Sequence, residues 1–420
     1  MTVYQANILF TSSPTHFDVY ERGYVAVDKC GIIQGVYHTL PENFAYDQLV
    51  DFGDKLLIPA MNDMHVHAPQ FVNMGVAMDM QLLPWLETYV FPEESKFTDE
   101  AYARTVYHSF VSELWRQGTM RAAVFATIHT PATHILARTF DEAGMGALIG
   151  LVGMDRHTPV ALCNTSSAWE KGMLTLIEAL DSMPLVKPII TPRFIPSCTP
   201  EMLRCMGDLA KQTELPVQSH LSENKQEIAW VKELEPESSC YGDAYHRYGL
   251  FGQTPTLMAH CCYTDGEELN LMREQNVFAV HCPTSNCNLA SGITPVRKLL
   301  QAGVNVALGS DIAGGHHISI FRVMQYAVQM SKLQYVASEG KYPFLTLSEV
   351  FYMATKSSGI FYGKVGSFEP GYAFDALVID DSSLLPIADN LTHRLERFIY
   401  IGDDRHIQHR FCQGNEIKQV

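Results

Sequence analysis

Two histidines, His65 and His67, stand two positions apart just beyond the apolar run Leu56–Pro59. In a β-strand, side chains at positions i and i+2 project to the same face, so both imidazoles can reach one metal ion. The pair alone is a weak signal, because the chain contains 17 histidines. It gains weight because other short apolar segments also end in a ligand-type residue: His220, His260 and Asp311. Such residues at the carboxyl ends of several strands indicate a metal-dependent hydrolase.

The ligand types favour one zinc ion, although iron(II) would also accept three imidazoles and a carboxylate. We predict that the metal ligands are His65, His67, His220 and Asp311. His260 is either a fifth ligand or a neighbouring group that holds the attacking water, and we favour the second role. A second metal ion is not expected. A two-metal site of this kind would carry a bridging, carbamylated lysine at the carboxyl end of the fourth predicted strand, but Lys187 lies at the start of that strand.

Glu223 lies three residues after His220, where the predicted strand gives way to a helix. A carboxylate there can take a proton from a water nucleophile and deliver it to a ring nitrogen, provided that its pKa lies near the working pH. The alternative is an acidic side chain that interacts with the N-terminus of the helix. We favour the catalytic role, because Glu223 lies so close to a predicted ligand.

Apolar segments alternate with amphipathic helices from about residue 60 to residue 330. Near-continuous apolar runs are typical of parallel strands covered on both faces. We predict a (β/α)₈ barrel of the TIM type, since ligand residues end several of these strands. A doubly wound sheet is the competing fold, but its site would lie at a single crevice. The predicted strands are Leu57–His67, Arg121–Ile128, Ala147–Asp155, Lys187–Phe194, Val217–His220, Thr256–Cys261, Val277–Cys282 and Asn305–Asp311.

Two of the intervening helices have recognisable starts. Thr264 with Glu267, and Thr346 with Glu349, have the spacing of a capping box. In that motif each side chain accepts a hydrogen bond from the backbone amide of the other residue. We therefore expect helices to begin directly after Thr264 and Thr346.

The two ends of the chain differ from its middle. Residues 1–58 contain short β runs broken by Pro14, Gly31 and Pro41, and residues 366–420 have the same texture. Neither end has enough strands to bury a sheet face alone. We expect the two ends to form one small β-sandwich domain beside a barrel of residues 59–365.

The composition bears on location and partners. With 420 residues, 47% of them hydrophobic, the chain can bury a large core. Its net charge of −16 and the lack of a basic block argue against nucleic acid as a partner. No apolar run reaches the roughly 20 residues that span a bilayer, and the first residues do not resemble a signal peptide. We expect a cytoplasmic protein with reduced cysteines that binds neither nucleic acid nor membrane.

At the predicted ligand positions the chain resembles the amidohydrolase superfamily. Within it, the chain is similar to the guanine deaminase family over nearly its full length. The narrower match depends on His-Ala-Pro-Gln, Trp-Leu-Glu-x-Tyr-x-Phe-Pro and Pro-Arg-Phe. One departure is Ala60, where such enzymes usually carry glycine. The matching segments are residues 67–70, 83–93, 192–194, 220–224, 258–261, 281–286 and 309–315.

The resemblance implies hydrolytic deamination of free guanine to xanthine and ammonia. Gln70 and Arg193 would hydrogen-bond the purine edge, with Arg193 near the 6-oxo group, while Phe194 packs on the ring. Guanine is planar and rich in donors and acceptors, which an amide, a guanidinium and an aromatic wall complement. An arginine there also discriminates against adenine, whose 6-amino group cannot accept its hydrogen bonds.

The expected reaction begins with water that the metal activates. With help from Asp311 this water loses a proton, and His260 positions it for attack on C2 of guanine. Glu223 then protonates the neighbouring ring nitrogen and assists departure of the 2-amino group as ammonia. We expect His220, Glu223 and Asp311 to contact the substrate as well.

Two alternatives stay open. A related mononuclear amidohydrolase would act on 8-oxoguanine, a pterin or a triazine instead. A non-catalytic interaction protein that retains the barrel is disfavoured, because the ligands and Glu223 are all present. The loop with Trp85, Leu86 and Phe91 is expected to border the pocket or a subunit interface without a catalytic role. The resemblance further implies a homodimer.

Overall fold

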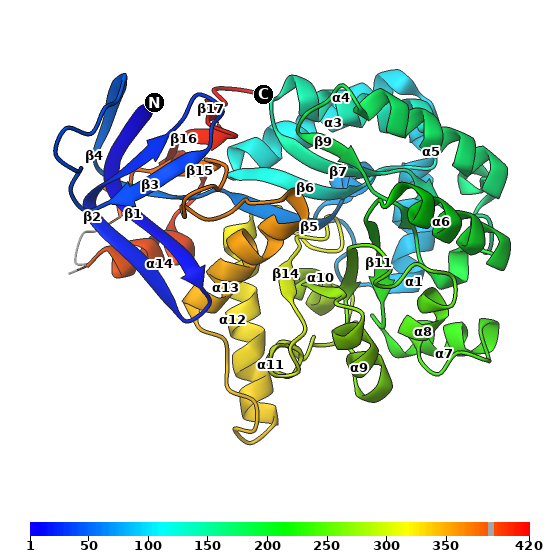
Figure 1. Ribbon diagram of the computed structural model, residues 1–420. Coiled ribbons are helices and arrows are strands. Elements are labelled where there is room, and N and C mark those ends of the chain that lie inside the picture. Colours follow the sequence, from blue (N-terminus) through cyan, green and yellow to red (C-terminus); the bar gives the residue numbers. More distant parts are fainter. Residues whose placement is uncertain (385–389) are drawn as a thin grey trace.

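Strands and helices alternate through the middle of the chain in the computed structural model, which describes residues 1–384 and 390–420 (Figure 1). Eight parallel strands form two four-stranded groups, and their presence confirms the predicted α/β class. A short parallel pair, β8 (Val152–Gly153) and β10 (Thr191–Pro192), lies outside these groups. The groups are β5 (Met61–His67), β6 (Thr119–Phe125), β7 (Gly146–Gly150) and β9 (Val186–Pro188), and then β11 (Val217–Leu221), β12 (Thr256–His260), β13 (Phe278–His281) and β14 (Val306–Leu308).

The two ends of the chain pair with each other, as Figure 1 shows beside the alternating part. Their described strands form one seven-stranded sheet in the order β17-β16-β15-β4-β1-β2-β3. β15 bonds directly to β4, so the strands of the two chain ends meet edge to edge in this sheet. The strands are β1 (Thr2–Ser13), β2 (His16–Val27), β3 (Ile33–Tyr37), β4 (Gln48–Pro59), β15 (Ala376–Ile379), β16 (Ile407–Cys412) and β17 (Asn415–Glu416).

Three predicted strands are divided in the structure. The segment Leu57–His67 breaks at Ala60, because β4 pairs with β15 whereas β5 pairs with β6. Ala147–Asp155 contains β7 and β8, and Lys187–Phe194 contains β9 and β10. In each segment the chain changes its hydrogen-bonding partner midway, and a continuous apolar run gives no sign of that change.

Hydrogen bonds link the two groups of parallel strands at both seams. Between β9 and β11, Ile190 forms a parallel bridge with Val217. Beyond β14, the amide of Asp311 donates to the carbonyl of His65 at 2.8 Å. The amide of His67 donates to the carbonyl of Ile312 at 3.1 Å. The carboxyl ends of β5 and β14 therefore lie side by side, and predicted ligands from both strands meet there.

Helices follow most of the parallel strands. The long ones each bury an apolar stripe; in α3, for example, Val106, Phe110 and Leu114 recur every four residues and are buried. Shorter helices build the loops at the strand ends. The helices are α1 (Leu82–Trp85), α2 (Phe91–Glu94), α3 (Glu100–Arg116), α4 (Thr130–Glu142), α5 (Ser166–Leu180), α6 (Pro200–Thr213), α7 (Lys225–Leu234), α8 (Tyr241–His246), α9 (Gly266–Glu274), α10 (Pro283–Asn288), α11 (Val296–Gln301), α12 (Ile320–Ala337), α13 (Leu347–Tyr352) and α14 (Leu391–Ile401).

One predicted capping box is confirmed and the other is wrong. Thr346 and Glu349 cap the start of α13 reciprocally. Helix α9 instead begins after Asp265, whose side chain accepts from the amide of Gly266. The hydroxyl of Thr264 donates to Glu268 at 2.8 Å, so this threonine serves a buried carboxylate and does not cap the helix.

Apolar side chains fill the space enclosed by the parallel strands. They come from both strand groups and are at most 4% exposed. Close packing of this kind holds the strand ends in fixed positions, which a site built from several strands requires. The cluster comprises Met64, Ala123, Leu148, Ile189, Leu257, Ala259, Phe278, Val280, Cys282 and Ala307.

A buried ion pair ties the terminal sheet to the parallel strands. The guanidinium of Arg121 in β6 donates to Asp375 from Nε at 2.5 Å and from Nη2 at 3.2 Å. The amide of Gln413 also donates to Asp375, at 2.7 Å. The side chains of Arg121 and Asp375 are only 4% and 1% exposed. This contact therefore joins residues that are far apart in the sequence at the junction of the two parts.

Asp375→Ala is expected to lower the free energy of unfolding by about 3–5 kcal/mol, because it leaves the guanidinium of Arg121 buried without its carboxylate. Urea unfolding followed by circular dichroism measures the change. The control is Glu237→Ala, which removes an exposed ion pair with Arg247 and should leave the melting temperature unchanged. An equally small effect of Asp375→Ala would mean that the buried pair contributes nothing to stability.

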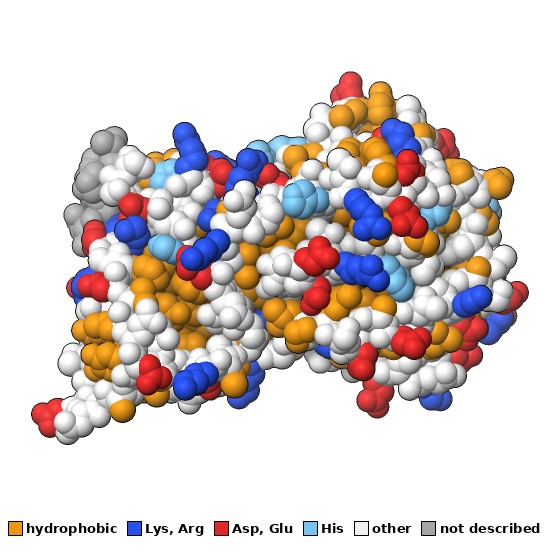
Figure 2. Space-filling model, turned by 90° about the horizontal axis from the view of Figure 1, so that it is seen from above, with side chains coloured by type: hydrophobic (Ala, Val, Ile, Leu, Met, Phe, Trp, Pro, Cys, Tyr) orange, Lys and Arg blue, Asp and Glu red, His pale blue; other side chains and the backbone are white. Residues whose placement is uncertain are grey.

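The surface agrees with the expected charge distribution. On the face in Figure 2, acidic and basic side chains are interspersed, and no broad basic patch is visible. All ten cysteines are free thiols. Among the described residues, no helix combines the length and apolar character needed to cross a membrane.

Candidate active site

The predicted site residues come together in one cavity at the carboxyl ends of the parallel strands. His65 is buried, and its ring centre lies 5.0 Å from that of His67 and 4.8 Å from that of His220. Trp85 and Leu86 line the cavity, as expected of a bordering loop, and so do the unpredicted residues Leu82, Glu227, Leu289 and Gly314. The predicted residues in its wall are His67, Gln70, Arg193, Phe194, His220, Glu223, His260 and Asp311.

The ligand atoms are spaced as a small metal ion requires. Nε2 of His67 lies 3.2 Å from Nε2 of His220 and 3.4 Å from Oδ1 of Asp311. Nε2 of His65 lies 3.1 Å from the same oxygen but makes no well-directed hydrogen bond with any described residue. Two ligands at about 2.0–2.1 Å from zinc in tetrahedral geometry lie about 3.3–3.4 Å apart. His65, His67 and Asp311 therefore form one group that fits such an ion, and His220 lies at the same spacing from His67.

The protonation states of these groups also suit a cation. Burial lowers the pKa of His65, and burial together with neighbouring histidines lowers those of His67 and His220 well below 6.5. Burial would raise the pKa of Asp311, but the surrounding histidines hold it far below its ordinary range. At neutral pH the cluster consequently presents neutral imidazoles and one buried carboxylate, the forms that bind metals.

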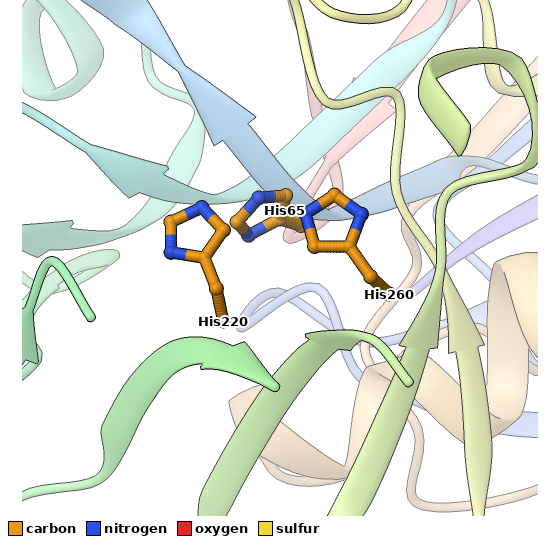
Figure 3. Close-up of side chains that lie close together, drawn as sticks. All are labelled: His65, His220 and His260. Carbon is orange, nitrogen blue, oxygen red and sulfur yellow. The ribbon is translucent and has the colours of Figure 1, made fainter. Parts of the chain in front are cut away.

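His260 faces the cluster from β12, as Figure 3 shows with His65 of β5 and His220 of β11. Its Nδ1 lies 2.8 Å from Oδ1 of Asn286, which accepts the ring proton and leaves Nε2 directed at the cavity. Nε2 is 3.7 Å from Oδ2 of Asp311, and His260 can share a metal with His65 and His220. This geometry is compatible with both roles considered for His260.

Glu223 lies just beyond β11 and is held between two groups. Its Oε1 accepts a hydrogen bond from the hydroxyl of Ser291 at 2.7 Å, and its Oε2 lies 3.6 Å from Nε2 of His260. Burial raises the pKa of Glu223, with a further contribution from Asp311, while His260 and Ser291 oppose the shift. A carboxyl group with a raised pKa, buried at the cavity wall, holds a proton more readily than an exposed one and is suited to proton transfer.

Gln70 and Arg193 both line the cavity and share one buried partner, Glu94. Arg193 Nη1 donates to Glu94 at 2.6 Å, and Gln70 Nε2 donates to the other oxygen of the same carboxylate at 3.1 Å. Oε1 of Gln70 accepts from the amide of Ala313 at 3.2 Å. The Arg193 guanidinium also lies 5.2 Å from the ring centre of Phe91. Both polar side chains are thus held in fixed orientations.

Several residues of this site adopt left-handed backbone conformations that non-glycine residues rarely take. The φ angles are 46° for Ser222, 71° for His260 and 48° for Asp311. Ser222 follows β11 directly, His260 ends β12, and Asp311 lies three residues beyond the end of β14. Such strained backbone costs of order 1–3 kcal/mol per residue and clusters at functional sites.

The sequence analysis missed four contributors to this arrangement. Asn286 orients His260, Ser291 holds Glu223, and Glu94 connects Gln70 with Arg193. Glu227 is buried at the cavity wall, where burial and the charge of Glu223 raise its pKa to about 7. Of these four residues, only Asn286 lies within a segment that resembles the guanine deaminase family, so only Asn286 could have been found from the sequence.

Comparison with known proteins identifies the family. A profile described as "Amidohydrolase family" matches residues 56–417. A guanine deaminase of Dictyostelium discoideum is 40% identical over 385 residues, which cover 89% of this chain and 84% of that protein.

Solved structures give the same result. A crystal structure of guanine deaminase from C. acetobutylicum with bound guanine is 48% identical, covers 99% of both chains and has a TM-score of 0.97. An adenosine deaminase from Xanthomonas campestris with bound zinc is 25% identical, with a TM-score of 0.86 over 99% of this chain and 92% of that one. The chain described here belongs to the amidohydrolase family and, within it, to the guanine deaminases.

Proposed function

We propose that this protein hydrolyses free guanine to xanthine and ammonia. The observation that supports this best is one shared cavity: the His and Asp cluster and Glu223 lie in the same wall as Arg193 and Gln70. A hydrolytic centre thus stands beside side chains that complement a purine edge. The 48% identical relative that was crystallised with guanine supports the same substrate.

One zinc ion, held by His65, His67, His220 and Asp311, is the proposed cofactor, and iron(II) is the alternative. When bound there, a divalent cation lowers the pKa of a water molecule and so supplies a nucleophile near neutral pH. His260 would hold this nucleophile through Nε2, whose direction Asn286 fixes from the other side of the ring. Asp311 would assist as an acceptor for the departing proton.

Glu223 would carry the protons of the reaction. It accepts one from the attacking water and donates it to the ring nitrogen next to C2, which prevents negative charge from building up on the purine. Transfer of the second proton of the same water to the 2-amino group lets that group leave as ammonia. The buried carboxyl group, with its raised pKa, suits both directions of transfer.

Substrate recognition would come from other residues of the same cavity wall. Arg193 would donate to the 6-oxo group, Gln70 would bond the purine edge, and Phe194 would pack on the ring. His220, Glu223 and Asp311 would contact the reacting end of the base. Because the 6-amino group of adenine cannot accept from a guanidinium, adenine would bind much more weakly.

Incubation of metal-replete protein with guanine tests the proposal. We expect xanthine and ammonia in equal amounts, measured by chromatography and by a coupled ammonia assay. Side-by-side kcat/KM values for guanine, 8-oxoguanine, a pterin and a triazine separate this function from its nearest rivals. A higher kcat/KM on any of those rings than on guanine would reassign the substrate.

We also propose how the chain is organised around this site. The strands from β5 to β14 would close into a (β/α)₈ barrel of residues 59–365, which the hydrogen bonds at both seams support. Residues 1–58 and 366–420 would form one small β-sandwich domain, which the pairing of β15 with β4 supports. A homodimer and a cytoplasmic location stay predictions from the sequence.

Ser291→Ala is expected to shift the acidic limb of the kcat/KM profile to higher pH. The hydroxyl of Ser291 stabilises ionised Glu223, so its loss raises the pKa of this carboxyl group further. Since Glu223 must be ionised to accept the first proton, activity should be lost at a higher pH as the solution is acidified. The loss of kcat/KM is expected to reach about tenfold or more on the acidic side of the profile and to vanish on its alkaline side, because one hydrogen bond to a charged group is worth roughly 1.5–3 kcal/mol.

The control for this prediction is Ser291→Thr, which retains a hydroxyl and should keep the limb near its original pH. An unchanged limb in Ser291→Ala would mean that another group controls the acidic side of the profile.

A further inference from the structure

Glu94 is buried next to the cavity but does not line it. It is the last residue of the short helix α2, and its side chain is 4% exposed. Each carboxylate oxygen has its own partner: Oε2 accepts from Arg193 at 2.6 Å, and Oε1 accepts from Gln70 at 3.1 Å. The two partners are the residues proposed to read the purine edge, and they lie 99 and 24 positions away in the sequence.

We propose that Glu94 is a positioning residue that sets the specificity of this enzyme for a 6-oxopurine by holding Arg193 and Gln70 in register. This inference rests on the proposed function, because it assigns a role toward the same substrate. Glu94 itself touches neither the base nor the reacting atoms.

Charge balance is the first reason for this role. The side chain of Arg193 is 6% exposed, so its positive charge needs a nearby negative one. Guanine is neutral and cannot supply that charge. The Glu94 carboxylate therefore allows a guanidinium to remain in the cavity wall before any substrate arrives.

Orientation is the second reason. A free amide can flip, which would exchange its donor and its acceptor. Here Gln70 Nε2 donates to Glu94 while Oε1 accepts from the amide of Ala313, so only one orientation satisfies both ends. Arg193 is held from two sides, by Glu94 and by the ring of Phe91. The donors and acceptors offered to the purine are thus fixed in advance, which lowers the entropy lost on binding.

The third reason is the connection to the cavity wall. Leu82, Trp85 and Leu86 belong to the segment that leads into α2, and all three line the cavity. Glu94 joins the end of that segment to Arg193. The distance between the apolar side chains of this segment and the guanidinium of Arg193 is therefore fixed. A fixed distance suits a planar base of one size.

Glu94→Gln tests the proposal, because it keeps the size of the side chain and removes its charge. We expect KM for guanine to rise at least tenfold while kcat stays within about threefold, since the proton-transferring groups are untouched. Discrimination should fall as well. In the wild type, hypoxanthine, which has a 6-oxo group, should inhibit more strongly than adenine, and we expect this ratio of inhibition constants to shrink at least tenfold in Glu94→Gln.

Two further variants keep the result interpretable. Glu94→Asp retains the charge and should recover part of the lost selectivity. Adding Glu94→Gln to an Arg193→Met background should change the inhibitor ratio by less than twofold, if Glu94 acts through Arg193. Asp375→Asn is the matched control, because it also neutralises a buried partner of an arginine but lies away from the cavity, so it should lower stability without changing KM.

Binding of xanthine to the chelated, metal-free proteins provides a readout that does not need turnover. Calorimetry should show weaker binding to Glu94→Gln than to the wild type. If wild-type protein does not turn over guanine, the proposed function itself fails. If the wild type does so and Glu94→Gln keeps its KM and its inhibitor ratio, the role assigned to Glu94 is wrong.

Discussion

Glu223→Gln is expected to lower kcat for guanine deamination by about 10²- to 10⁴-fold, the usual contribution of a positioned acid–base group. Glutamine has nearly the same shape and can still accept from Ser291, so the cavity should keep its geometry. It cannot take a proton from water at any accessible pH or return one to the ring. Stopped-flow or steady-state absorbance at saturating guanine measures the loss, and KM should change little.

The control for Glu223→Gln is Glu233→Gln, an exposed residue of the following helix α7. Both variants lose one carboxylate from the same stretch of chain, but only Glu223 lies in the cavity wall. Metal content should equal that of the wild type in both. Near-normal turnover by Glu223→Gln would transfer the proton-carrying role to another residue, and the buried Glu227 would be the first to test.

Removal of the metal is expected to have two effects: deamination falls to the rate measured without enzyme, and the melting temperature of the protein falls. Without a cation, water near neutral pH is a poor nucleophile, because its pKa falls to about 7 only when it is bound to a metal such as zinc. The folded state alone assembles the four ligands, so an ion at 1,000 times its dissociation constant stabilises it by about 4 kcal/mol. Dialysis against a chelator, followed by metal analysis, activity assays and calorimetry, measures both effects.

Adding back zinc should restore activity and melting temperature in the wild type, at close to one ion per chain. His67→Ala should bind less than a tenth of this amount, whereas His409→Ala, in β16 of the terminal sheet, should bind as much as the wild type. Full activity after complete removal of metal would contradict the proposed chemistry. Restoration by iron(II) to a higher kcat than by zinc would change the identity of the metal but not its place.

Several residues that the structure places at the cavity could be recognised in the sequence because they end short segments rich in apolar residues. His260 ends β12 directly after the apolar residues Leu257, Met258 and Ala259, whereas His220 in β11 follows the polar residues Gln218 and Ser219 and depends more on the preceding apolar residues 215–217. Polar side chains at such positions stand out in the sequence. Their meeting in space then follows from the parallel order of the strands.

Glu94 could not be predicted in the same way. It stands beside Glu93 in a short acidic stretch that has the composition of an ordinary helix start. The Glu93 side chain is three times as exposed as that of Glu94, at 13% against 4%, and binds Lys96 and Tyr102 near the surface. Which of two adjacent glutamates turns inward depends on the rotation of a single helical turn, and the sequence pattern does not specify that rotation.

The terminal strands show a similar limit. Their composition indicated a β structure built from both ends, and the pairing of β15 with β4 fits this. Whether those strands form one sheet or two depends on which edges meet, and each run of alternating residues is compatible with several neighbours. The choice of edge depends on tertiary contacts, which the alternating pattern of one strand does not specify.

The place of β15 in that sheet has a consequence for how the chain matures on the ribosome. β4 ends at Pro59, and the strand that covers its open side begins only at Ala376. At about 5–20 residues per second, roughly 15–60 s of translation separate the two. During this interval the apolar residues Leu56, Leu57 and Ile58 have an uncovered edge that can pair with other nascent chains. Slower elongation should therefore increase the fraction of newly made protein that aggregates or needs a chaperone.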